Sequence, residues 1–296
     1  SWLGAVLLVG LASAAAAQTT TGTILGDVKD STGGSLPGVT VTAVNQANGL
    51  TREAVTDELG TYRFAAMPPG VYTIKASLAG FKEATRADLR LAINSQLVAP
   101  FTLEVGGLEE TITVTEQAPL VDTTENVVRT LVDTQQIANL PLKSRDFMDL
   151  AILSPGVVTD QGSASAGQTD SISFGGMSEN YKSMWLEGVD FNDEVTGGGS
   201  SLSSATRIAL AQEAIQEFQV MANSYSAEFG RSASGAINIL TKSGGNQIRG
   251  SAFYFRRDDA YDKPNYFAVD VPEFKIEQYG ATVGGPILQN RLFYFG

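Results

Sequence analysis

The chain has 296 residues, which suits two domains of ordinary size or three small ones, and 43% of its residues are hydrophobic, as in folded proteins. The formal net charge is −12 and the longest basic cluster is Arg256 with Arg257, so no nucleic-acid partner is expected. The sequence contains no cysteine and no histidine, which excludes disulfides, thiolate chemistry, Ser-His-Asp triads and most zinc sites. We therefore predict that the chain is not an enzyme, with no catalytic residue, cofactor or metal site.

Residues 2–17 form an apolar run that ends in small residues, with Ala15, Ala16 and Ala17 in the pattern of a cleavage site. This composition predicts a secretory signal peptide over residues 1–17, truncated at its start. A membrane helix is the alternative, but the run is short and rich in alanine for one. No later segment has the length of a membrane-spanning helix, so any insertion downstream is expected to use a β-barrel.

Residues 20–105 contain short runs in which apolar and polar residues alternate. Four such runs, separated by turn-forming residues, lie at residues 22–29, 39–44, 62–65 and 71–78. Alternation with period two predicts strands that bury one face, so this segment is expected to form a small antiparallel β-sandwich.

The same segment resembles the carboxypeptidase regulatory-like domain. The resemblance rests on residues 26–28, 36–41, 56–64, 67–72 and 79–81. It implies a prealbumin-like sandwich of seven strands over residues 20–105 that carries no catalytic site.

Gly106 and Gly107 separate the sandwich from a linker, which we place at residues 106–118. In the linker, threonine alternates with Ile112 and Val114, a composition that predicts an exposed strand. The residues alone leave open whether this strand is the first of the following domain or the last of the sandwich.

Residues 119–245 have the pattern of a mixed α+β domain. One short helix is expected at residues 134–140, ended by Pro141, and another at residues 145–153, capped by Ser144. Short strands are expected at residues 172–174, 184–186, 216–221 and 235–240.

A glycine-rich break at residues 242–246 leads into strands of a different character. Residues 248–257, 274–284 and 291–295 alternate and have about the length of tilted membrane strands, the last one cut short. Aromatic residues at 253–255 and 293–295 suit the girdles at the bilayer interfaces. Residues 246–296 are therefore predicted to be the first strands of a truncated transmembrane β-barrel, with a soluble β-domain as the alternative.

The stretch around this break resembles the end of the plug domain of TonB-dependent outer-membrane receptors and the first strand of their barrel. It is carried by residues 228–232 and 235–244, with further support at residues 132–134, 139–142 and 186–190. Residues 279–287 also resemble an early barrel strand in the Oar-like branch of these receptors. The resemblance implies an N-terminal fragment with three domains: sandwich, plug at residues 119–245 and incomplete barrel.

The family resemblance implies energy-coupled uptake of a ligand through a plugged barrel in the outer membrane, with the sandwich in the periplasm. Its partners would be a TonB-type periplasmic energy-transducing protein, outer-membrane lipid and an unknown extracellular ligand, which could be an oligosaccharide, a peptide or a metal chelate. The segment expected to pair with the TonB-type protein is Glu110, Thr111, Ile112, Thr113, Val114 and Thr115. The plug loop expected to face the ligand is Gly175, Gly176, Met177, Ser178, Glu179, Asn180 and Tyr181, with residues 197–203 as a second loop.

Two other functions remain open from the residues alone. One is an outer-membrane-anchored adhesion or structural protein whose sandwich binds a surface polymer. The other is a secreted carbohydrate-processing enzyme, which the missing histidine and cysteine disfavour.

One acidic stretch resembles a metal loop. Residues 190–194 resemble a calcium loop, but Val195 and Ser201 stand where an EF-hand needs glycine and glutamate, so a plain acidic turn is expected in preference to a weak cation site.

Overall fold

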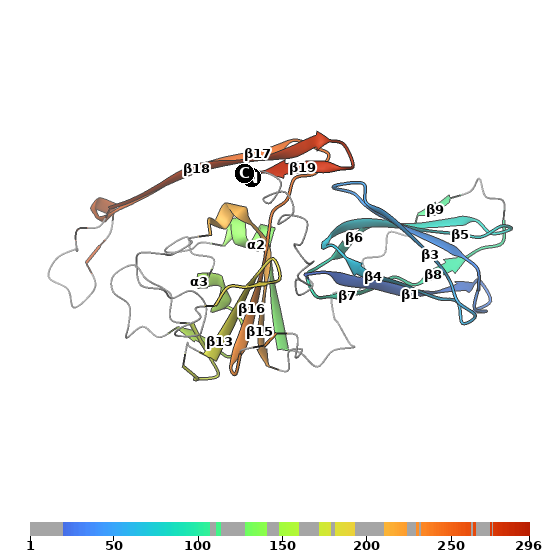
Figure 1. Ribbon diagram of the computed structural model, residues 1–296, viewed down its shortest axis with the longest axis horizontal. Coiled ribbons are helices and arrows are strands. Elements are labelled where there is room, and N and C mark those ends of the chain that lie inside the picture. Colours follow the sequence, from blue (N-terminus) through green and yellow to red (C-terminus); the bar gives the residue numbers. More distant parts are fainter. Residues whose placement is uncertain are drawn as a thin grey trace, which may run out of the picture. The chain divides into compact units, whose positions relative to one another are not determined.

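The computed structural model shows a chain made mostly of strands (Figure 1). It describes residues 20–106, 111–113, 128–140, 148–159, 172–178, 181–192, 210–223, 229–230, 232–261, 263–264, 273 and 275–296. The chain divides into two compact units, of which the first ends at Thr241 and the second begins at Lys242 and includes the short segment Ala47–Gly49. None of the helices in the described ranges combines the length and the apolar composition needed to cross a membrane.

The first sheet of the N-terminal sandwich is built around β1 (Gly22–Asp30). β4 (Thr61–Met67) pairs with it in antiparallel fashion, whereas β7 (Gln96–Val98) and β8 (Phe101–Leu103) pair with it in parallel. β7 and β8 pair with successive parts of β1 and are separated only by Ala99 and Pro100. The ladder is interrupted there because Pro100 has no N–H to donate. The expected antiparallel sandwich is therefore wrong in this respect, since the sheet is mixed.

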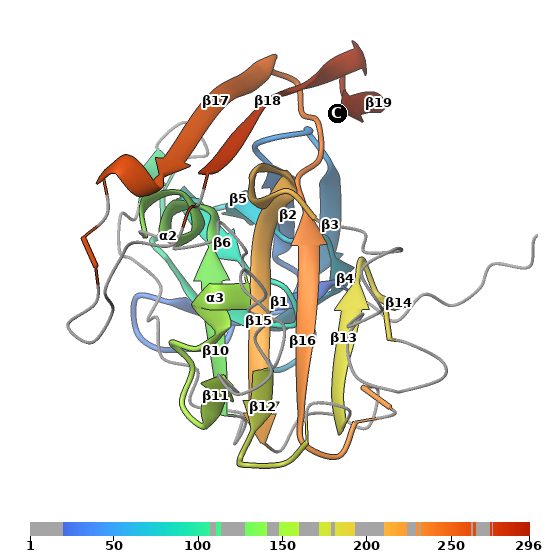
Figure 2. The same ribbon diagram turned by 90° about the vertical axis from the view of Figure 1, so that its left-hand side faces the viewer.

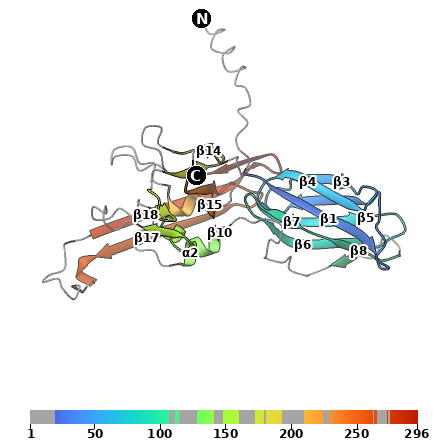
Figure 3. The same ribbon diagram turned by 90° about the horizontal axis from the view of Figure 1, so that it is seen from below.

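The second sheet has the order β3-β2-β5-β6-β9. Its strands are β2 (Thr40–Asn45), β3 (Thr51–Val55), β5 (Gly70–Ser77), β6 (Glu83–Leu91) and β9 (Thr111–Thr113), and Figure 3 shows most of them beside the strands of the first sheet. The first four strands are antiparallel neighbours, and β9 runs parallel to β6.

The core of the sandwich follows from the alternation in its strands. In β1 and β2 every second residue is buried, and Ile24, Val28 and Val41 are fully inaccessible to solvent. Tyr62 packs edge-on against Phe64, and its buried hydroxyl donates a hydrogen bond to the carbonyl of Ala99. Both sheets thus bury one face against the other, as period-two patterning predicts.

The second domain is organised on a five-stranded sheet of order β10-β15-β16-β13-β14 (Figure 2). Its strands are β10 (Val128–Asp133), β13 (Lys182–Leu186), β14 (Val189–Asp190), β15 (Ile215–Asn223) and β16 (Gly235–Thr241). β13 and β16 are parallel and the other pairs are antiparallel. A separate hairpin-like pair joins β11 (Val157–Thr159) to β12 (Ile172–Phe174).

One face of this sheet carries an apolar core with α2 (Thr134–Asn139) and α3 (Met148–Ala151). Phe218, Ile237 and Ile239 are fully buried in it together with Ile137 and Leu150 of the helices. The opposite face is mixed: it buries Trp185, Met221, Phe229 and Ala236 as an apolar cluster, beside Glu217, Gln219 and Asn238.

The helix expected at residues 145–153 ends two residues earlier in the structure. α3 ends at Ala151, where the Ser154 N–H donates to the Ala151 carbonyl and Gly156 takes a positive φ of 80°. Gly156 lies in the following turn, where the Val157 N–H donates to the Ser154 carbonyl and only glycine adopts the left-handed conformation without strain. Residues 145–147 and the expected cap Ser144 lie outside the described residues.

The second unit contains an antiparallel sheet of β17 (Arg249–Asp258), β18 (Lys275–Leu288) and β19 (Leu292–Phe295). These strands match the three expected after the glycine-rich break, although β18 is longer than predicted, at 14 residues. The mainly β fold class, with a sandwich, a mixed α+β domain and further strands, is therefore confirmed.

Gly235 provides a test of packing in the second domain. A Cβ at this position would lie 2.4 Å from the ring of Phe174, a side chain that is only 1% exposed. We predict that Gly235→Ala destabilises the sheet by about 1–3 kcal/mol, because the ring has no free space to move into. Amide hydrogen exchange of β16 in the full-length protein measures this effect.

Gly230 supplies the matched control, because a Cβ there meets nothing within 4 Å. Gly230→Ala should change protection by less than about 0.5 kcal/mol. Equal effects of the two substitutions would contradict the packing described for Phe174.

Candidate functional site

The candidate coupling segment, residues 110–115, is only partly described. Thr111, Ile112 and Thr113 form β9, while Glu110, Val114 and Thr115 lie outside the described residues. The structure brings β9 to β6, so this part of the segment is the last strand of the sandwich, one of the two positions left open by the sequence. Its role in binding a partner stays a prediction.

The chain that leads to β9 is fastened beside the start of β6. The Lys82 N–H donates to the Glu104 carbonyl at 2.9 Å, and the Lys82 ammonium lies 3.6 Å from the Glu104 carboxylate. The Gly106 N–H donates to the Gly80 carbonyl at 3.2 Å. The segment therefore enters β9 from an anchored position.

The candidate ligand loop, residues 175–181, connects β12 to β13. Gly175 and Gly176 both adopt positive φ, which lets the chain turn sharply after Phe174. Met177 and Tyr181 are exposed, at 41% and 52% of their surface. Glu179 and Asn180 of the prediction lie outside the described residues, as do residues 197–203 of the second loop.

The base of this loop is held by backbone contacts. The Tyr181 carbonyl accepts hydrogen bonds from the N–H groups of Ala233 and Ser234, which precede β16. The loop therefore projects exposed side chains from a rigid attachment to the sheet.

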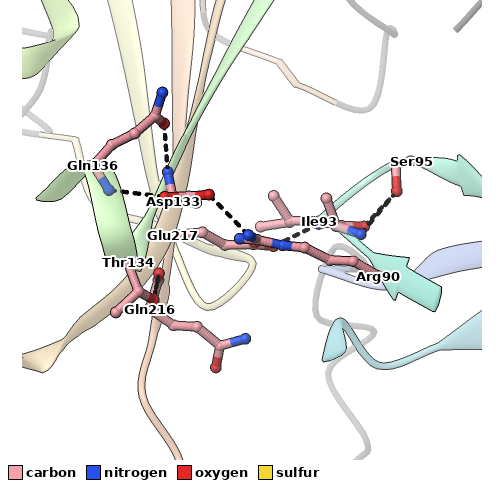
Figure 4. Close-up of polar contacts among 9 residues, drawn as sticks. Arg90, Ile93, Ser95, Asp133, Thr134, Gln136, Gln216 and Glu217 are labelled. Atoms are coloured by element: carbon pink, nitrogen blue, oxygen red, sulfur yellow. Dashed lines mark hydrogen bonds and ion pairs between the residues drawn. The ribbon is translucent and has the colours of Figure 1, made fainter. Parts of the chain in front are cut away.

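The structure also reveals a site that sequence reasoning missed, at residues 92–95 of the sandwich (Figure 4). This turn between β6 and β7 reaches the second domain: the Ile93 N–H donates to Glu217 Oε1 at 2.7 Å, and Arg129 Nη1 donates to the Asn94 carbonyl at 2.9 Å. Ile93 is fully buried. We call these residues, with Arg90 and Asp133, the docking site.

Arg90 bridges two carboxylates at the docking site. Its Nη1 lies 2.8 Å from Asp133 Oδ2 and its Nη2 lies 3.2 Å from Glu217 Oε2. Asp133 is also the N-cap of α2, where it accepts the Gln136 N–H in a capping box. One carboxylate thus orders the helix and holds the arginine at the same time.

Burial acts differently on the two carboxylates. It raises the pKa of Glu217 above its ordinary value, although hydrogen bonds from Ile93 and Arg90 favour the charged form. At Asp133 burial again acts to raise the pKa, but the Gln136 N–H and Arg90 outweigh it, so the pKa is lowered. The only feature of the sequence that points to the docking site is the carboxylate of Glu217, at a position that strand alternation places on a buried face of the sheet.

A row of polar side chains crosses the same face of the sheet as Glu217. Gln219 of β15 is the register partner of Asn238 of β16, which is in turn the partner of Trp185 of β13. All three side chains are buried, and in the described part of the chain Gln219 Oε1, Asn238 Oδ1 and Trp185 Nε1 have no hydrogen-bond partner.

The acidic turn at residues 190–194 is described only through Asn192. Asp190 Oδ1 accepts the Asn192 N–H, and Asn192 Oδ1 accepts the Met184 N–H, so these side chains hold the turn after β13. Within the described ranges, no group of three or more carboxylates has the arrangement needed to hold a metal ion.

Comparison with known proteins assigns three domains to the chain. Family models match it at residues 23–104 (carboxypeptidase regulatory-like domain), 120–237 (TonB-dependent receptor plug domain) and 240–296 (outer membrane beta barrel domain). The TonB-dependent transporter Oar of Myxococcus xanthus is 27% identical over 309 residues, which cover 99% of this chain and 28% of that protein. The chain thus spans little more than a quarter of this curated relative.

Two solved structures of receptors also resemble the chain. The siderophore receptor PirA of Acinetobacter baumannii is 20% identical with a TM-score of 0.43, over 57% of this chain and 23% of its own. The ferric enterobactin receptor PfeA of Pseudomonas aeruginosa is 18% identical with a TM-score of 0.39, over 55% and 23%.

The three domain matches and their order confirm the predicted resemblance to Oar-like TonB-dependent receptors. A plug domain followed by an outer-membrane barrel domain places the protein in the outer membrane. The matched families are those of receptors and transporters.

Substitutions of Glu217 test the hydrogen bond between its carboxylate and the Ile93 N–H. Glu217→Ala leaves the buried Ile93 N–H without its acceptor, which costs about 1–3 kcal/mol. We expect amide exchange at Ile93 in the full-length protein to quicken about 10- to 100-fold. Glu217→Gln keeps an acceptor oxygen and should have a smaller effect. Gln216→Ala, whose side chain points away from Arg90 and Ile93 in Figure 4, should leave the rate within about twofold. An unchanged rate in Glu217→Ala would mean that the docking contact does not exist.

The pH dependence of docking has a definite sign. Because the pKa of Glu217 is raised when docked, its contribution is fully present below the ordinary value of 4.5 and is lost as the pH rises through the docked pKa. Asp133 acts in the opposite sense and loses its contribution only as the pH falls below its ordinary value of 3.8. Protection of Ile93, corrected for intrinsic exchange, should therefore weaken from pH 4.5 toward neutrality in the wild type and stay level in Glu217→Gln. A wild-type profile parallel to the variant's would contradict the raised pKa.

Proposed function

We propose that the chain is part of an energy-coupled outer-membrane receptor that takes up a ligand through a β-barrel closed by a plug. The observation that carries this proposal is the unbroken passage from a match to the receptor plug domain to a match to an outer-membrane barrel domain near residue 240. A plug serves a purpose only inside a wide pore, because small barrels fill their interiors with side chains.

One face of the β17–β18 pair supports a membrane position. It carries Tyr254 opposite Tyr279, followed by Ala252 opposite Ala281. Both tyrosines are highly exposed, at 60% and 77%, although such large rings are usually covered in a soluble sheet. We assign this face to outer-membrane lipid, with the tyrosines at the level of the interface.

Charged residues continue the same face beyond the tyrosines. Arg256 is opposite Glu277, and Asp258 is opposite Lys275. Arg256 also pairs with Asp258 at 2.5 Å. A charged band directly beyond an aromatic pair is the order found where a barrel strand leaves the bilayer.

Ligand contact is assigned to the loop at residues 175–181, which presents Met177 and Tyr181 from the rigid plug sheet. The ligand is an extracellular molecule of the oligosaccharide, peptide or metal-chelate classes. Energy for its passage would come from a TonB-type periplasmic protein that pairs with residues 110–115 by strand addition. The sandwich then lies in the periplasm together with this segment.

Proline substitution tests the coupling segment. Neighbouring N–H groups of a strand point to opposite edges, so Ile112→Pro and Thr113→Pro each remove a donor from a different edge. We expect at least one of these variants to bind the purified periplasmic domain of the TonB-type protein about tenfold more weakly, in pull-down from membranes that hold the full-length receptor.

Ile112→Val keeps a β-branched side chain and should bind as the wild type does. Wild-type binding by both proline variants, with normal amounts of receptor in the outer membrane, would show that coupling does not run through this strand.

A further inference from the structure

We infer that docking of the sandwich is coupled to the folding of α2 in the second domain, so that undocking of residues 92–95 loosens α2 and the start of β15. The coupling goes beyond the proposed function and rests on the contacts alone. In the proposed receptor it lets the sandwich control how firmly this part of the plug is held.

Asp133 takes part in both structures, because its two carboxylate oxygens have different partners. Oδ1 accepts the Gln136 N–H at 2.8 Å and so caps α2, whereas Oδ2 lies 2.8 Å from Arg90 Nη1 of the sandwich. An arginine bound to one oxygen restricts the rotation of the carboxylate and keeps the other oxygen directed at the helix. Docking therefore favours the capped helix, and the capped helix favours docking.

α2 needs such support because it is short. It has six residues, and a helix of this length is not stable by itself in water. Its first residue, Thr134, donates a hydrogen bond from its hydroxyl to the carbonyl of Gln216, the neighbour of Glu217 in β15. The Gln212 side chain, just before β15, donates to the Ile137 carbonyl. The helix and the start of β15 are thus held together, so the loss of docking at Glu217 affects both.

Undocking leaves the apolar cores of the two domains intact. Among the described residues, the core cluster of the sandwich shares no member with the apolar clusters of the plug sheet. The docking site joins the domains through hydrogen bonds and ion pairs. Such contacts are replaced by contacts with water when domains separate, so the sandwich can leave the plug without unfolding.

Substitutions in the sandwich test the coupling through a measurement in the plug. Arg90→Met in the full-length protein removes both ion pairs and keeps an unbranched apolar side chain. We expect amide exchange across residues 134–140, measured in isolated outer membranes, to quicken about tenfold. Arg90→Lys keeps the charge but loses the planar group that bridges two carboxylates, and should have a smaller effect.

Lys75→Met is the matched control. Lys75 forms an ion pair with Glu83 at 3.3 Å inside the sandwich, and its side chain is about as exposed as that of Arg90, at 49% against 45%. The control should leave exchange at residues 134–140 within about twofold of the wild type. Equal exchange of α2 in Arg90→Met and in Lys75→Met would overturn the inference.

A substitution in α2 tests the reverse direction, because coupling between two sites is reciprocal. Gln136→Ala removes the side chain that accepts the Asp133 N–H at 3.0 Å. We expect exchange of the Ile93 N–H in the sandwich to quicken about fivefold. Gln135→Ala makes the same change at the neighbouring exposed position and should leave Ile93 within about twofold. Equal effects of the two alanine variants on Ile93 would also overturn the inference.

Protection of Ile24 in the sandwich core and of Ile237 in the plug core shows whether each variant is folded. If Arg90→Met loses protection there, Arg90→Lys decides the first test, with faster exchange of α2 still expected. The measurements need neither ligand nor partner. A protein that transports nothing would therefore reject the proposed function and leave the coupling in place, whereas unchanged exchange would reject the coupling alone.

Discussion

The buried carboxylate of Glu217 is the interaction on which the relation between the sandwich and the plug sheet depends. It accepts the Ile93 N–H from the sandwich and shares Arg90 with Asp133, which starts α2. A buried charge that loses its partners is far costlier than one that keeps them, so the contact is held as a unit. The same burial that fixes the turn at residues 92–95 in place also makes its strength depend on pH.

β6 links this contact to the candidate coupling strand. Its first residues, from Glu83 to Thr85, carry β9, and its penultimate residue is Arg90 at the docking site. β6 thus carries β9 near one end and contacts β15 of the plug sheet near the other, through Arg90 and Glu217.

β2 could be predicted from the sequence because its burial alternates with period two. β16 could be predicted because it is a short, continuous, mostly apolar run that is buried on both faces. β6 was missed because its pattern breaks where Asp88 takes a positive φ of 58° and the register with β5 shifts. The place of β9 depends on a parallel pairing that no local pattern encodes, and the two alternatives had to stay open. The docking site joins Ile93 to Glu217, 124 residues apart, and only the fold brings them together.

The row formed by Gln219, Asn238 and Trp185 makes the two faces of the plug sheet differ in how they interact with water. Gln219 Oε1, Asn238 Oδ1 and Trp185 Nε1 are buried and have no protein hydrogen-bond partner in the described part of the chain, and a buried polar atom left without any hydrogen bond costs about 1–3 kcal/mol. Water that enters on this side finds buried hydrogen-bond donors and acceptors. The side lined by Phe218 and Ile237 is apolar and offers water no hydrogen bond. Entering water would therefore gain hydrogen bonds on the polar side of the plug sheet and none on its apolar side.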